Sequence, residues 1–489
     1  MTGEGLGRRQ FVLGGAAALL LLPSCARTGT RIASPTPSTP STPAAPQPVS
    51  TISELFALAP FYIAHRGSGD NWPEHTAVAY RNAAEAGAQA IEISVNATSD
   101  GILVCHHDTN TWRMTGVDRE IGRTTWEELS GLKNNATAWL GPSTPLEPIP
   151  LLRDVLDELA ADGRRVIFVE DKQGTNTRAL LDLLDSYPDS TEHFVWKQWA
   201  GARQHQLAQE RGYTAWGYFT SEIQSTESVI DSFDYLGVFH TAPDEFVADL
   251  VSTGKPVIAW EVHYRSVRDR LAKLGVVGMM CSNIPYVTAT AALAARDTFA
   301  TGMRAAGDLP WTVDLGWGVQ PKLTADAGTV LLDYAGNQSY LMGSFAPIDA
   351  SSFEISFRIR WPKVLPADTQ HAGISFGVEN DRPYRLGFAG DVSGYHAVLR
   401  ADGSLELHEQ AKGTAEGNVL DSVQTPAPAA GEWIDLVVAV SEARIAVSRD
   451  RNLSWEAAVD DARYRGGYFW LCKNYAEPVA VEYSSVIVE

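Results

Sequence analysis

Charged residues follow directly after short apolar segments in one stretch of this chain. Residues 61–64 are apolar and lead into a His-Arg-Gly run that begins at His65, and a later apolar segment leads into a His-His-Asp run that ends at Asp108. A helical pattern at residues 75–88 separates the first apolar segment from the next one, at 90–95. Strands joined through a helix run parallel, and parallel sheets and (β/α)8 barrels carry their chemistry at the carboxyl ends of the strands. The stretch therefore indicates an α/β fold and a candidate site at its strand ends.

Between residues 53 and 295, apolar strand candidates alternate with helical patterns. The nine candidates centre on Ile63, Ile93, Val104, Phe168, Val195, Ala215, Val238, Ile258 and Met279. The candidate at Val104 follows its predecessor after only a turn at 98–101, and so short a turn joins antiparallel neighbours, since parallel strands need a crossover of about a dozen residues or more. We therefore expect residues 102–107 to form a hairpin arm, and the other eight strands to close a (β/α)8 TIM barrel over residues 53–295.

The pattern changes after a connector at residues 296–309. Residues 310–489 contain short alternating segments separated by turns, and they lack a long helical pattern. The predicted strands are 353–361, 372–377, 384–388, 395–399, 405–409, 433–440, 444–448, 468–471 and 479–488. This pattern predicts an antiparallel β-sandwich. Two folded domains suit a chain of 489 residues, because single cores rarely grow beyond about 300 residues.

The segment up to residue 25 resembles a bacterial export signal. The pair Arg8 and Arg9 precedes an apolar run at 11–22 that is shorter than the roughly 20 residues of a membrane span. A Leu-Pro-Ser-Cys sequence resembles a lipobox, in which Cys25 would carry a lipid; the alternative is ordinary signal cleavage with Cys25 as a bystander. Residues 26–52 are rich in Pro, Ser and Thr and predict an extended linker. We expect export by the twin-arginine route, with the protein either lipid-anchored at the outer cell surface through Cys25 or secreted.

The chain is acidic, with a formal net charge of −20 and an isoelectric point near 5.0. This charge argues against nonspecific binding to nucleic acid. It also repels phosphate esters at long range, so a phosphodiester site would need its own arginine, lysine or metal ion. Cys105 and Cys281 lie in apolar strand segments and are expected to be buried thiols.

A series of ordered motifs resembles the glycerophosphodiester phosphodiesterase family. They are the H-R-G at His65, the P-E-x-T at Pro73, the strand around Glu92 with its Asp-Gly turn, the H-D at His107, the E-x-K at Glu170, the W-x-V at Trp260, and the closing segments at 275–278 and 282–285. The resemblance covers roughly residues 59–295. It implies a TIM barrel that hydrolyses glycerophosphodiesters or phospholipid-derived substrates with the help of a divalent cation.

The C-terminal region resembles concanavalin A-like jelly rolls more loosely. The similarity rests on the opening strand at 353–361, the G-I-S-F-G segment at 373–377 and the D-G-S-L-E-L hairpin at 402–407. Because such modules often bind glycans, the resemblance implies a glycan ligand. The alternative is that tryptophans of this region, such as Trp361 and Trp470, only fill the core.

His65 and His107 are the predicted catalytic residues. Phosphodiester hydrolysis needs a base for the attacking oxygen and an acid for the leaving alkoxide, and an imidazole can serve as either near neutral pH. The resemblance favours His107 over His106, because His107 directly precedes Asp108 as in the family's H-D motif. The alternative is that each histidine is a capped loop residue.

Arg66 and Lys172 are the predicted phosphate-binding residues. A guanidinium offers a planar donor fork for phosphoryl oxygens. Lys172 stands two residues after Glu170, so the two share a strand face and Lys172 can contact the phosphate.

Glu92 and Glu170 are predicted to bind Ca²⁺ or Mg²⁺, which prefer hard oxygen ligands. Glu74, in the first loop, is either a third metal ligand or a loop anchor. The chain departs from the family at two acidic positions, where Ser94 and Asn283 replace aspartates. Loss of a carboxylate at position 94 should weaken the binding of a divalent cation. His75 and His263 depart from the family's motifs as well.

These observations predict an exported phosphodiesterase that hydrolyses glycerophosphodiesters to an alcohol and glycerol phosphate by metal-assisted histidine acid–base catalysis. One alternative is a catalytically impaired surface binding protein. Another is a phosphodiesterase similar to sphingomyelinase D, in which an internal hydroxyl attacks and a cyclic phosphate forms.

Overall fold

The computed structural model describes residues 49–161, 165–219, 227–305, 322–324, 328–343, 345 and 351–489. The predicted export signal, the predicted lipid attachment site Cys25 and nearly all of the predicted linker lie outside this part of the chain. Within it, no helix has the length and apolar character needed to cross a bilayer.

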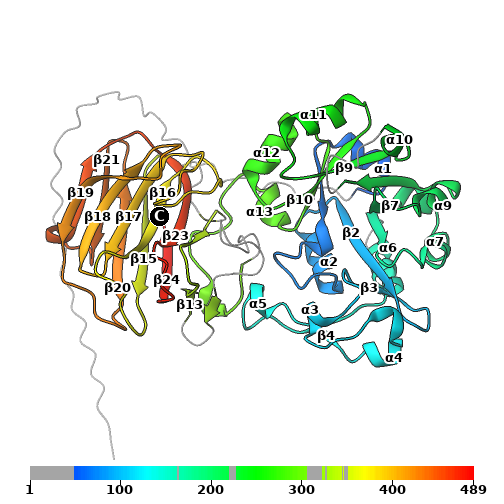
Figure 1. The fold of residues 1–489 in the computed structure, drawn as a ribbon, viewed down its shortest axis with the longest axis horizontal. Helices are drawn as coiled ribbons and strands as arrows, with labels where there is room; N and C mark the ends of the chain where they lie inside the picture. The colour runs from blue at the N-terminus through cyan, green and yellow to red at the C-terminus, as the bar shows by residue number, and fades with distance from the viewer. Residues whose placement is uncertain are drawn as a thin grey trace, which may run out of the picture. The chain divides into compact units, whose positions relative to one another are not determined.

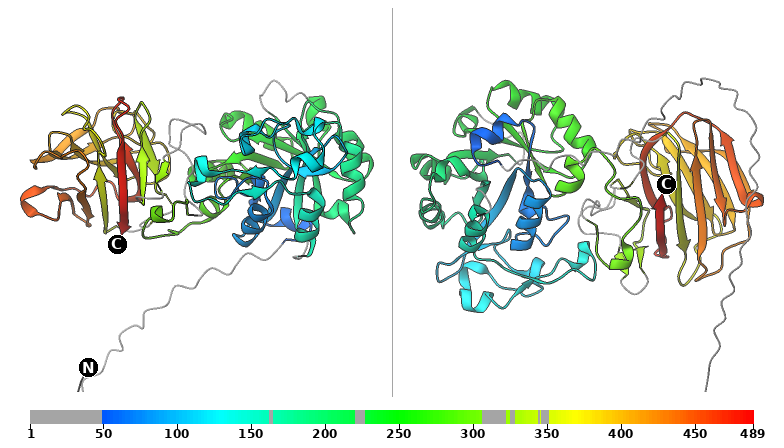
Figure 2. Two further views of the ribbon diagram at one scale, coloured as in Figure 1. Left: turned by 90° about the horizontal axis from the view of Figure 1, so that it is seen from below. Right: turned by 180° about the vertical axis from the view of Figure 1, so that it is seen from behind.

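Eight parallel strands close the first domain into a barrel (Figure 1, Figure 2). They are β1 (Phe61–Ala64), β2 (Ala90–Ala97), β6 (Val166–Asp171), β7 (Phe194–Trp199), β8 (Thr214–Tyr218), β9 (Tyr235–Phe239), β10 (Val257–Val262) and β11 (Gly278–Cys281). Each strand pairs with the next in this order, and β1 pairs with both β11 and β2, which completes the ring. The predicted (β/α)8 TIM barrel is confirmed.

The helices of this domain lie outside the ring of strands (Figure 1). The longer ones are α1 (Ile52–Ala57), α2 (Ala77–Glu85), α6 (Leu152–Ala161), α7 (Thr177–Leu184), α9 (His205–Glu210), α11 (Asp244–Ser252) and α12 (Arg265–Lys273). The shorter ones are α3 (Trp112–Thr115), α4 (Trp126–Leu129), α5 (Thr137–Leu140), α8 (Ser190–His193), α10 (Glu227–Asp231) and α13 (Ile284–Thr288). Among the longer helices, α6 buries an apolar side made of Leu152, Val155, Leu156 and Leu159.

The extra strand β3 (Leu103–Cys105) lies outside the ring as predicted. It pairs antiparallel with the end of β2, with Val95 opposite Cys105. Gly101 in the connecting turn has φ +83, a left-handed conformation that favours glycine. The hairpin folds the chain back toward the carboxyl end of the barrel, so that the histidines after β3 can reach the strand ends.

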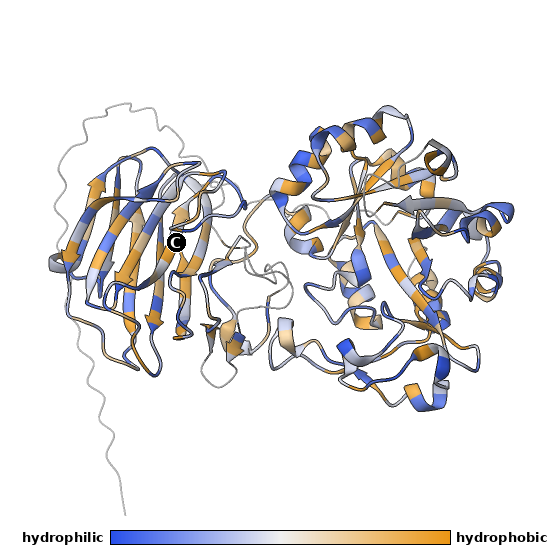
Figure 3. Ribbon diagram, in the orientation of Figure 1, coloured by the Kyte–Doolittle hydropathy of each residue, from blue (hydrophilic) through white to orange (hydrophobic). Residues whose placement is uncertain are grey.

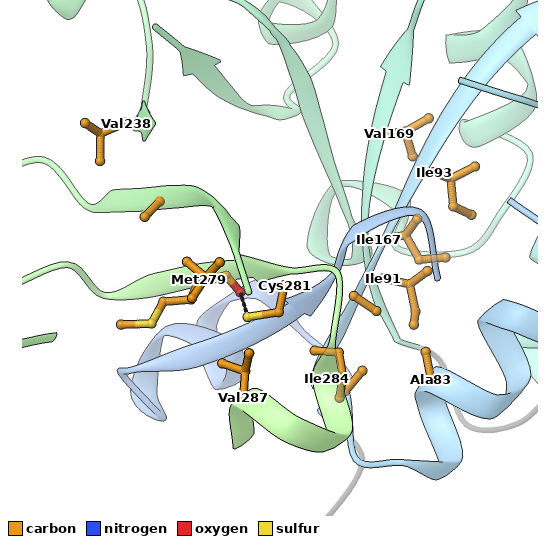
Figure 4. Packing of buried hydrophobic residues seen from close by; sticks show 14 of the residues in the cluster. Ala83, Ile91, Ile93, Ile167, Val169, Val238, Met279, Cys281, Ile284 and Val287 are labelled. Atoms are coloured by element: carbon orange, nitrogen blue, oxygen red, sulfur yellow. Dashed lines mark hydrogen bonds between the residues drawn. The ribbon is translucent and has the colours of Figure 1, made fainter. Parts of the chain in front are cut away.

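Alternation along β2 decides which of its side chains reach the barrel interior. Ile91 and Ile93 pack outward in one cluster with apolar residues of β6 and α2 (Figure 4). Glu92 and Ser94, at the intervening positions, therefore point into the barrel, where both are fully buried.

The same alternation holds on β6 and β7. Phe168 and Val195 belong to the apolar cluster that fills the barrel interior toward the amino ends of the strands. Glu170 and Lys197 stand two residues further along their strands, on the same inward side. A polar layer of carboxylates and one lysine thus lies above the apolar interior, toward the carboxyl ends of the strands.

The second domain is an antiparallel β-sandwich, as predicted. One sheet has the order β12-β13-β24-β15-β20-β21-β22 and the other β14-β23-β16-β17-β18-β19. The strands are β12 (Lys322–Thr324), β13 (Thr329–Leu332), β14 (Gln338–Leu341), β15 (Phe353–Arg360), β16 (His371–Gly377), β17 (Gly394–Arg400), β18 (Ser404–Gln410), β19 (Asn418–Gln424), β20 (Ile434–Val440), β21 (Arg444–Arg449), β22 (Glu456–Asp460), β23 (Gly466–Lys473) and β24 (Val481–Val488). Side chains of both sheets share one apolar core, and apolar and polar residues alternate along strands such as β15 (Figure 3).

One predicted strand of the sandwich is wrong. Residues 384–388 form no strand, although Tyr384 is buried. Pro383 precedes the segment and Gly387 has φ +82, so the backbone turns there instead of extending. The resemblance to concanavalin A-like jelly rolls, beyond the two-sheet architecture, stays a prediction.

Candidate active site

The end of β1 is fixed to β2 by its backbone. The segment η1 (His65–Gly67) follows β1, and both Arg66 and Gly67 adopt left-handed conformations with φ 54 and φ 77. A Cβ atom on Gly67 would lie 2.9 Å from the Cβ of Ala79 in α2, so glycine permits this close approach. The backbone N–H of Arg66 donates to Oε2 of Glu92 at 2.9 Å.

His65 has a carboxylate partner that sequence analysis did not assign to the site. Its Nδ1 lies 2.7 Å from Oε2 of Glu261 at the end of β10 and 2.9 Å from Oγ of Ser282, which follows β11. Burial opposes ionisation of Glu261, but the nearby imidazoles hold its pKa well below the ordinary value. Because an ionised carboxylate only accepts hydrogen bonds, His65 carries a proton on Nδ1, and its Nε2 remains for a substrate.

A second histidine, His263, lies close to the carboxylate of Glu261. His263 Nδ1 lies 2.7 Å from Oδ2 of Asp70, and its Nε2 lies 3.7 Å from Oε2 of Glu261. Burial disfavours a charged ring, but the two carboxylates outweigh this effect and raise the pKa of His263 to about 9. A buried row of side chains, Asp70, His263, Glu261 and His65, therefore reaches the end of β1.

The surroundings of His107 lower its pKa, whereas those of His263 raise the pKa of that ring. Its Nδ1 donates to Oδ1 of Asp108 at 2.7 Å, and Nε of Arg113 donates to the other carboxylate oxygen at 2.6 Å. Burial lowers the pKa of His107 to about 4, and the positive charges of Arg66 and Lys172 act in the same direction against the bond to Asp108. At neutral pH His107 is thus uncharged, with the proton on Nδ1 and a free lone pair on Nε2.

His75, one of the departures from the family, lies beside His107. The two rings stack with centroids 6.4 Å apart and an angle of 13° between their planes. His75 Nδ1 bonds to the hydroxyl of Tyr80 at 2.7 Å, and burial keeps the pKa of His75 well below its ordinary value. A neutral ring at this position supports the orientation of His107 without adding charge.

Glu74 anchors two arginines. Arg66 Nη1 lies 3.2 Å from Oε2 of Glu74, and Arg113 contacts both carboxylate oxygens, at 2.5 and 3.0 Å. The Glu74 side chain is only 2% exposed. Burial would raise its pKa, but the two guanidinium groups hold that pKa well below the ordinary value. Of the two roles predicted for Glu74, these contacts match the loop anchor.

Lys197 lies between the two predicted metal ligands. Its Nζ is 2.9 Å from Oε1 of Glu92 and 2.5 Å from Oε2 of Glu170. The hydroxyl of Ser94 donates to Oε1 of Glu92 at 2.9 Å. Burial opposes the charge on all three ionisable groups, yet their mutual attraction prevails. It raises the pKa of Lys197, holds the pKa of Glu92 well below its ordinary value and lowers the pKa of Glu170 to about 2.

Lys172 and Tyr218 complete the contacts of Glu170. Lys172 Nζ lies 3.2 Å from Oε1 of Glu170, as expected for two residues on one strand face. The hydroxyl of Tyr218 donates to the same oxygen at 2.7 Å. Burial lowers the pKa of Lys172, although Glu170 opposes the shift.

These contacts do not fit a divalent cation at the predicted carboxylates. Glu92 and Glu170 each accept at least one hydrogen bond on each of their oxygens, and the ammonium of Lys197 lies between them. Both oxygens of Glu74 face guanidinium groups. In the described residues, no group of three or more His, Cys, Asp or Glu side chains is arranged to hold a metal ion. Assignment of Ca²⁺ or Mg²⁺ to Glu92, Glu170 and Glu74 stays a prediction that this arrangement does not favour.

The predicted site residues do gather at one end of the barrel. Arg66 connects Glu92 with Glu74, and the charges of Arg66 and Lys172 both act on His107. The residues that sequence analysis missed are the partners Lys197, Glu261, His263, Asp70 and Arg113. Of these, Lys197 carried a usable signal, since it stands two residues after Val195 in a strand whose inward positions follow period two.

Comparison with known proteins shows what the barrel is similar to. Residues 65–185 match the protein-family model of the glycerophosphoryl diester phosphodiesterase family. The chain is 33% identical over 147 residues to human glycerophosphodiester phosphodiesterase 1, a match that covers 29% of this chain and 44% of the human protein. It is 38% identical over 112 residues to a glycerophosphodiester phosphodiesterase of Caldanaerobacter subterraneus subsp. tengcongensis, covering 23% of this chain and 45% of that protein.

Solved structures resemble the chain as well. A phosphodiesterase of Oleispira antarctica, in complex with the product sn-glycerol-3-phosphate, is 20% identical with a TM-score of 0.42, and the match covers 48% of this chain and 97% of that one. The chain spans less than half the length of the human and Caldanaerobacter relatives. Enzymes of this family generally depend on a divalent metal. The family-model match over residues 65–185 and these relatives show that the barrel of this chain is similar to the glycerophosphoryl diester phosphodiesterase family.

Proposed function

We propose that this barrel hydrolyses glycerophosphodiesters to an alcohol and glycerol phosphate, with His107 as the general base and His65 as the general acid. The observation that supports this assignment best is the contrast between the two histidines. His107 is neutral with an unprotonated Nε2, whereas the Nδ1 of His65 lies 2.7 Å from the carboxylate of Glu261. Similarity to the glycerophosphoryl diester phosphodiesterase family supports the substrate class.

In the proposed reaction, Nε2 of His107 removes a proton from water as the water oxygen attacks phosphorus. The bond from phosphorus to the leaving alcohol oxygen breaks, and Nε2–H of His65 gives that oxygen a proton. Glu261 stabilises the positive charge that His65 bears while both its nitrogens are protonated. Asp108 does the same for His107 after it has taken up the proton.

Arg66 and Lys172 are proposed to hold the phosphate. A phosphodiester carries one negative charge before attack and more in the transition state, and these two cations lie close enough to His107 to affect its pKa. The remaining N–H groups of Arg66 beyond its bonds to Glu74 could face a phosphoryl oxygen.

Two alternative functions differ from this hydrolysis in the products that they would give. A catalytically impaired binding protein would bind a glycerophosphodiester without turnover. A reaction similar to that of sphingomyelinase D would release the alcohol but yield a cyclic phosphate, since an internal hydroxyl replaces water as the nucleophile. The proposed acid and base, with Arg66 and Lys172 as proposed phosphate ligands, favour the hydrolase over the binding protein.

Activity on a set of glycerophosphodiesters with choline, ethanolamine, glycerol and inositol head groups tests the proposal. Phosphorus NMR of the products separates a phosphomonoester from a cyclic phosphate. His107→Ala and His65→Ala should each lower kcat by about 100-fold or more, the usual effect of losing a general acid or base. His205→Asn is a matched control, because this buried histidine of α9 bonds to Gln198 and lies outside the proposed site. Near-normal rates in either alanine variant would remove that histidine from the mechanism.

Export by the twin-arginine route, lipid attachment at Cys25 and a glycan ligand of the β-sandwich are proposed from the sequence motifs alone. Incorporation of labelled palmitate into the full-length protein, compared with Cys25→Ala, tests the anchor. Retention of the full chain on cell-wall polysaccharide, compared with a chain truncated after residue 305, tests the glycan ligand.

A further inference from the structure

The cation between Glu92 and Glu170 is part of the polypeptide. Lys197 reaches from β7 with its Nζ 2.9 Å from one carboxylate and 2.5 Å from the other, and the residue is 5% exposed. The ring of Tyr218 lies beside it, with the ring centroid 5.4 Å from Nζ. Two carboxylates facing each other in a barrel interior require a positive charge, and here an ammonium group supplies it.

The other contacts of the two carboxylates suit an ammonium rather than a dication. Oε2 of Glu92 accepts the backbone N–H of Arg66, and Oε1 of Glu170 accepts from Lys172 and Tyr218. A divalent cation bound between the carboxylates would have to displace these donors and would also repel Lys197 at close range.

Ser94 is consistent with this arrangement. It stands on the same inward side of β2 as Glu92, and its hydroxyl donates to Oε1 of Glu92 at 2.9 Å. An aspartate at this position would add a third negative charge that a single ammonium cannot balance. The serine at position 94 therefore suits Lys197, since a dication with three carboxylates has the same net charge as an ammonium with two.

We propose that Lys197 takes the place of the divalent cation in this barrel, so that the protein neither binds Ca²⁺ or Mg²⁺ at Glu92 and Glu170 nor needs them for the phosphodiesterase reaction on which this inference rests. An ammonium has three N–H bonds, and among the described residues two of them are donated to Glu92 and Glu170. The third is left for an oxygen of the bound phosphate. Lys197 is thus an internal cation that positions both carboxylates.

Calorimetric titration of the full chain with Ca²⁺, Mg²⁺ and Mn²⁺ tests the proposal without reference to activity. The EDTA-treated wild type should show no binding up to millimolar concentration. The double variant Lys197→Ser, Ser94→Asp should bind at least one of these ions at least tenfold more tightly, because three carboxylates then face an open position. Lys172→Met is the matched control, since it removes a nearby ammonium that does not lie between the two carboxylates; it should stay without metal affinity.

The rate of glycerophosphodiester hydrolysis with and without EDTA provides a second test. The wild-type rate should be unchanged by EDTA, Lys197→Met should lower it at least tenfold, and Lys197→Arg should retain EDTA resistance. Metal binding by the wild type together with loss of its activity in EDTA would overturn the proposal while leaving the phosphodiesterase function intact. If no glycerophosphodiester is hydrolysed but the titrations come out as expected, the proposed function fails and the internal cation stands. If the Lys197 variants do not fold, the wild-type titration and EDTA test still decide the matter.

Discussion

Glu261 Oε2 lies 2.7 Å from Nδ1 of His65, although Glu261 lies in β10 and His65 follows directly after β1, far away in the sequence. The contact exists because β10 and β1 both pair with β11, which brings their carboxyl ends to one part of the barrel rim. Ser282 after β11 donates to the same carboxylate oxygen at 3.0 Å. The carboxylate fixes both the orientation of the His65 ring and the position of its proton.

Removal of this carboxylate charge should affect turnover more than binding. Glu261→Gln preserves the size of the side chain but removes the anion that stabilises protonated His65, so we expect kcat to fall about tenfold or more while KM changes little. Steady-state kinetics on the best substrate provide the measurement. A rise in KM with unchanged kcat would show instead that Glu261 serves binding.

The pH dependence of kcat/KM should report His107. Burial lowers the pKa of His107 to about 4, and the base must be unprotonated to accept a proton from water, so activity should hold down to about pH 4 and fall below it. Arg66→Gln should move this acid limb to higher pH, because it removes a positive charge that lowers the pKa. An acid limb near pH 6.5 in the wild type would contradict the assignment.

His263 should make stability depend on alkaline pH. Its pKa is raised to about 9 in the folded protein against an ordinary value of 6.5, so the protonated ring favours folding. The contribution is fully present below about pH 6.5, is lost as pH rises through about 9, and is on the order of 3 kcal/mol. Urea unfolding at pH 6.5 and pH 10 should show this loss in the wild type.

His263→Gln is the variant that isolates this effect. It should lower the free energy of unfolding at pH 6.5 and flatten its decline toward pH 10. His193→Gln, at a histidine whose Nδ1 contacts the carbonyl of Ser50, provides the control. An unchanged decline in His263→Gln would mean that other groups cause the alkaline loss.

Glu74 should matter for folding as much as for the site. Glu74→Gln leaves Arg66 and Arg113 without their shared buried anion, and breaking such a pair costs about 3 kcal/mol or more. Thermal unfolding should show the loss, and KM should rise because Arg66 is no longer held in place. A stable variant with unchanged KM would argue that Glu74 is not the anchor of this loop.

The barrel could be predicted from local sequence because its signals are local. The length of the turn at 98–101 separated β3 from the eight parallel strands, and the strand-end positions of His65, Glu92 and Glu170 placed them at one rim. The wrong strand at 384–388 shows the limit of this approach, since apolar residues there are buried within a turning backbone.

Partners within the site were harder to predict because they depend on which strands meet around the ring. Lys197 lies in an apolar segment that predicts a strand. The segment does not predict which residues the Lys197 side chain contacts. Glu261 stands at the variable position of the W-x-V motif at Trp260, which gave it no predicted role. Its contact with His65 depends on the register of β10, β11 and β1 and on the loop after β11. The spacing of residues in the sequence does not show this register.

The most direct test of the central claim is phosphodiester turnover by the EDTA-treated full-length protein, measured as release of glycerol phosphate. We predict that the wild type turns over without added metal and that His107→Ala is slower by about 100-fold or more under the same conditions. Absence of turnover with any glycerophosphodiester, with or without Ca²⁺ or Mg²⁺, would contradict the assignment of this barrel as a phosphodiesterase.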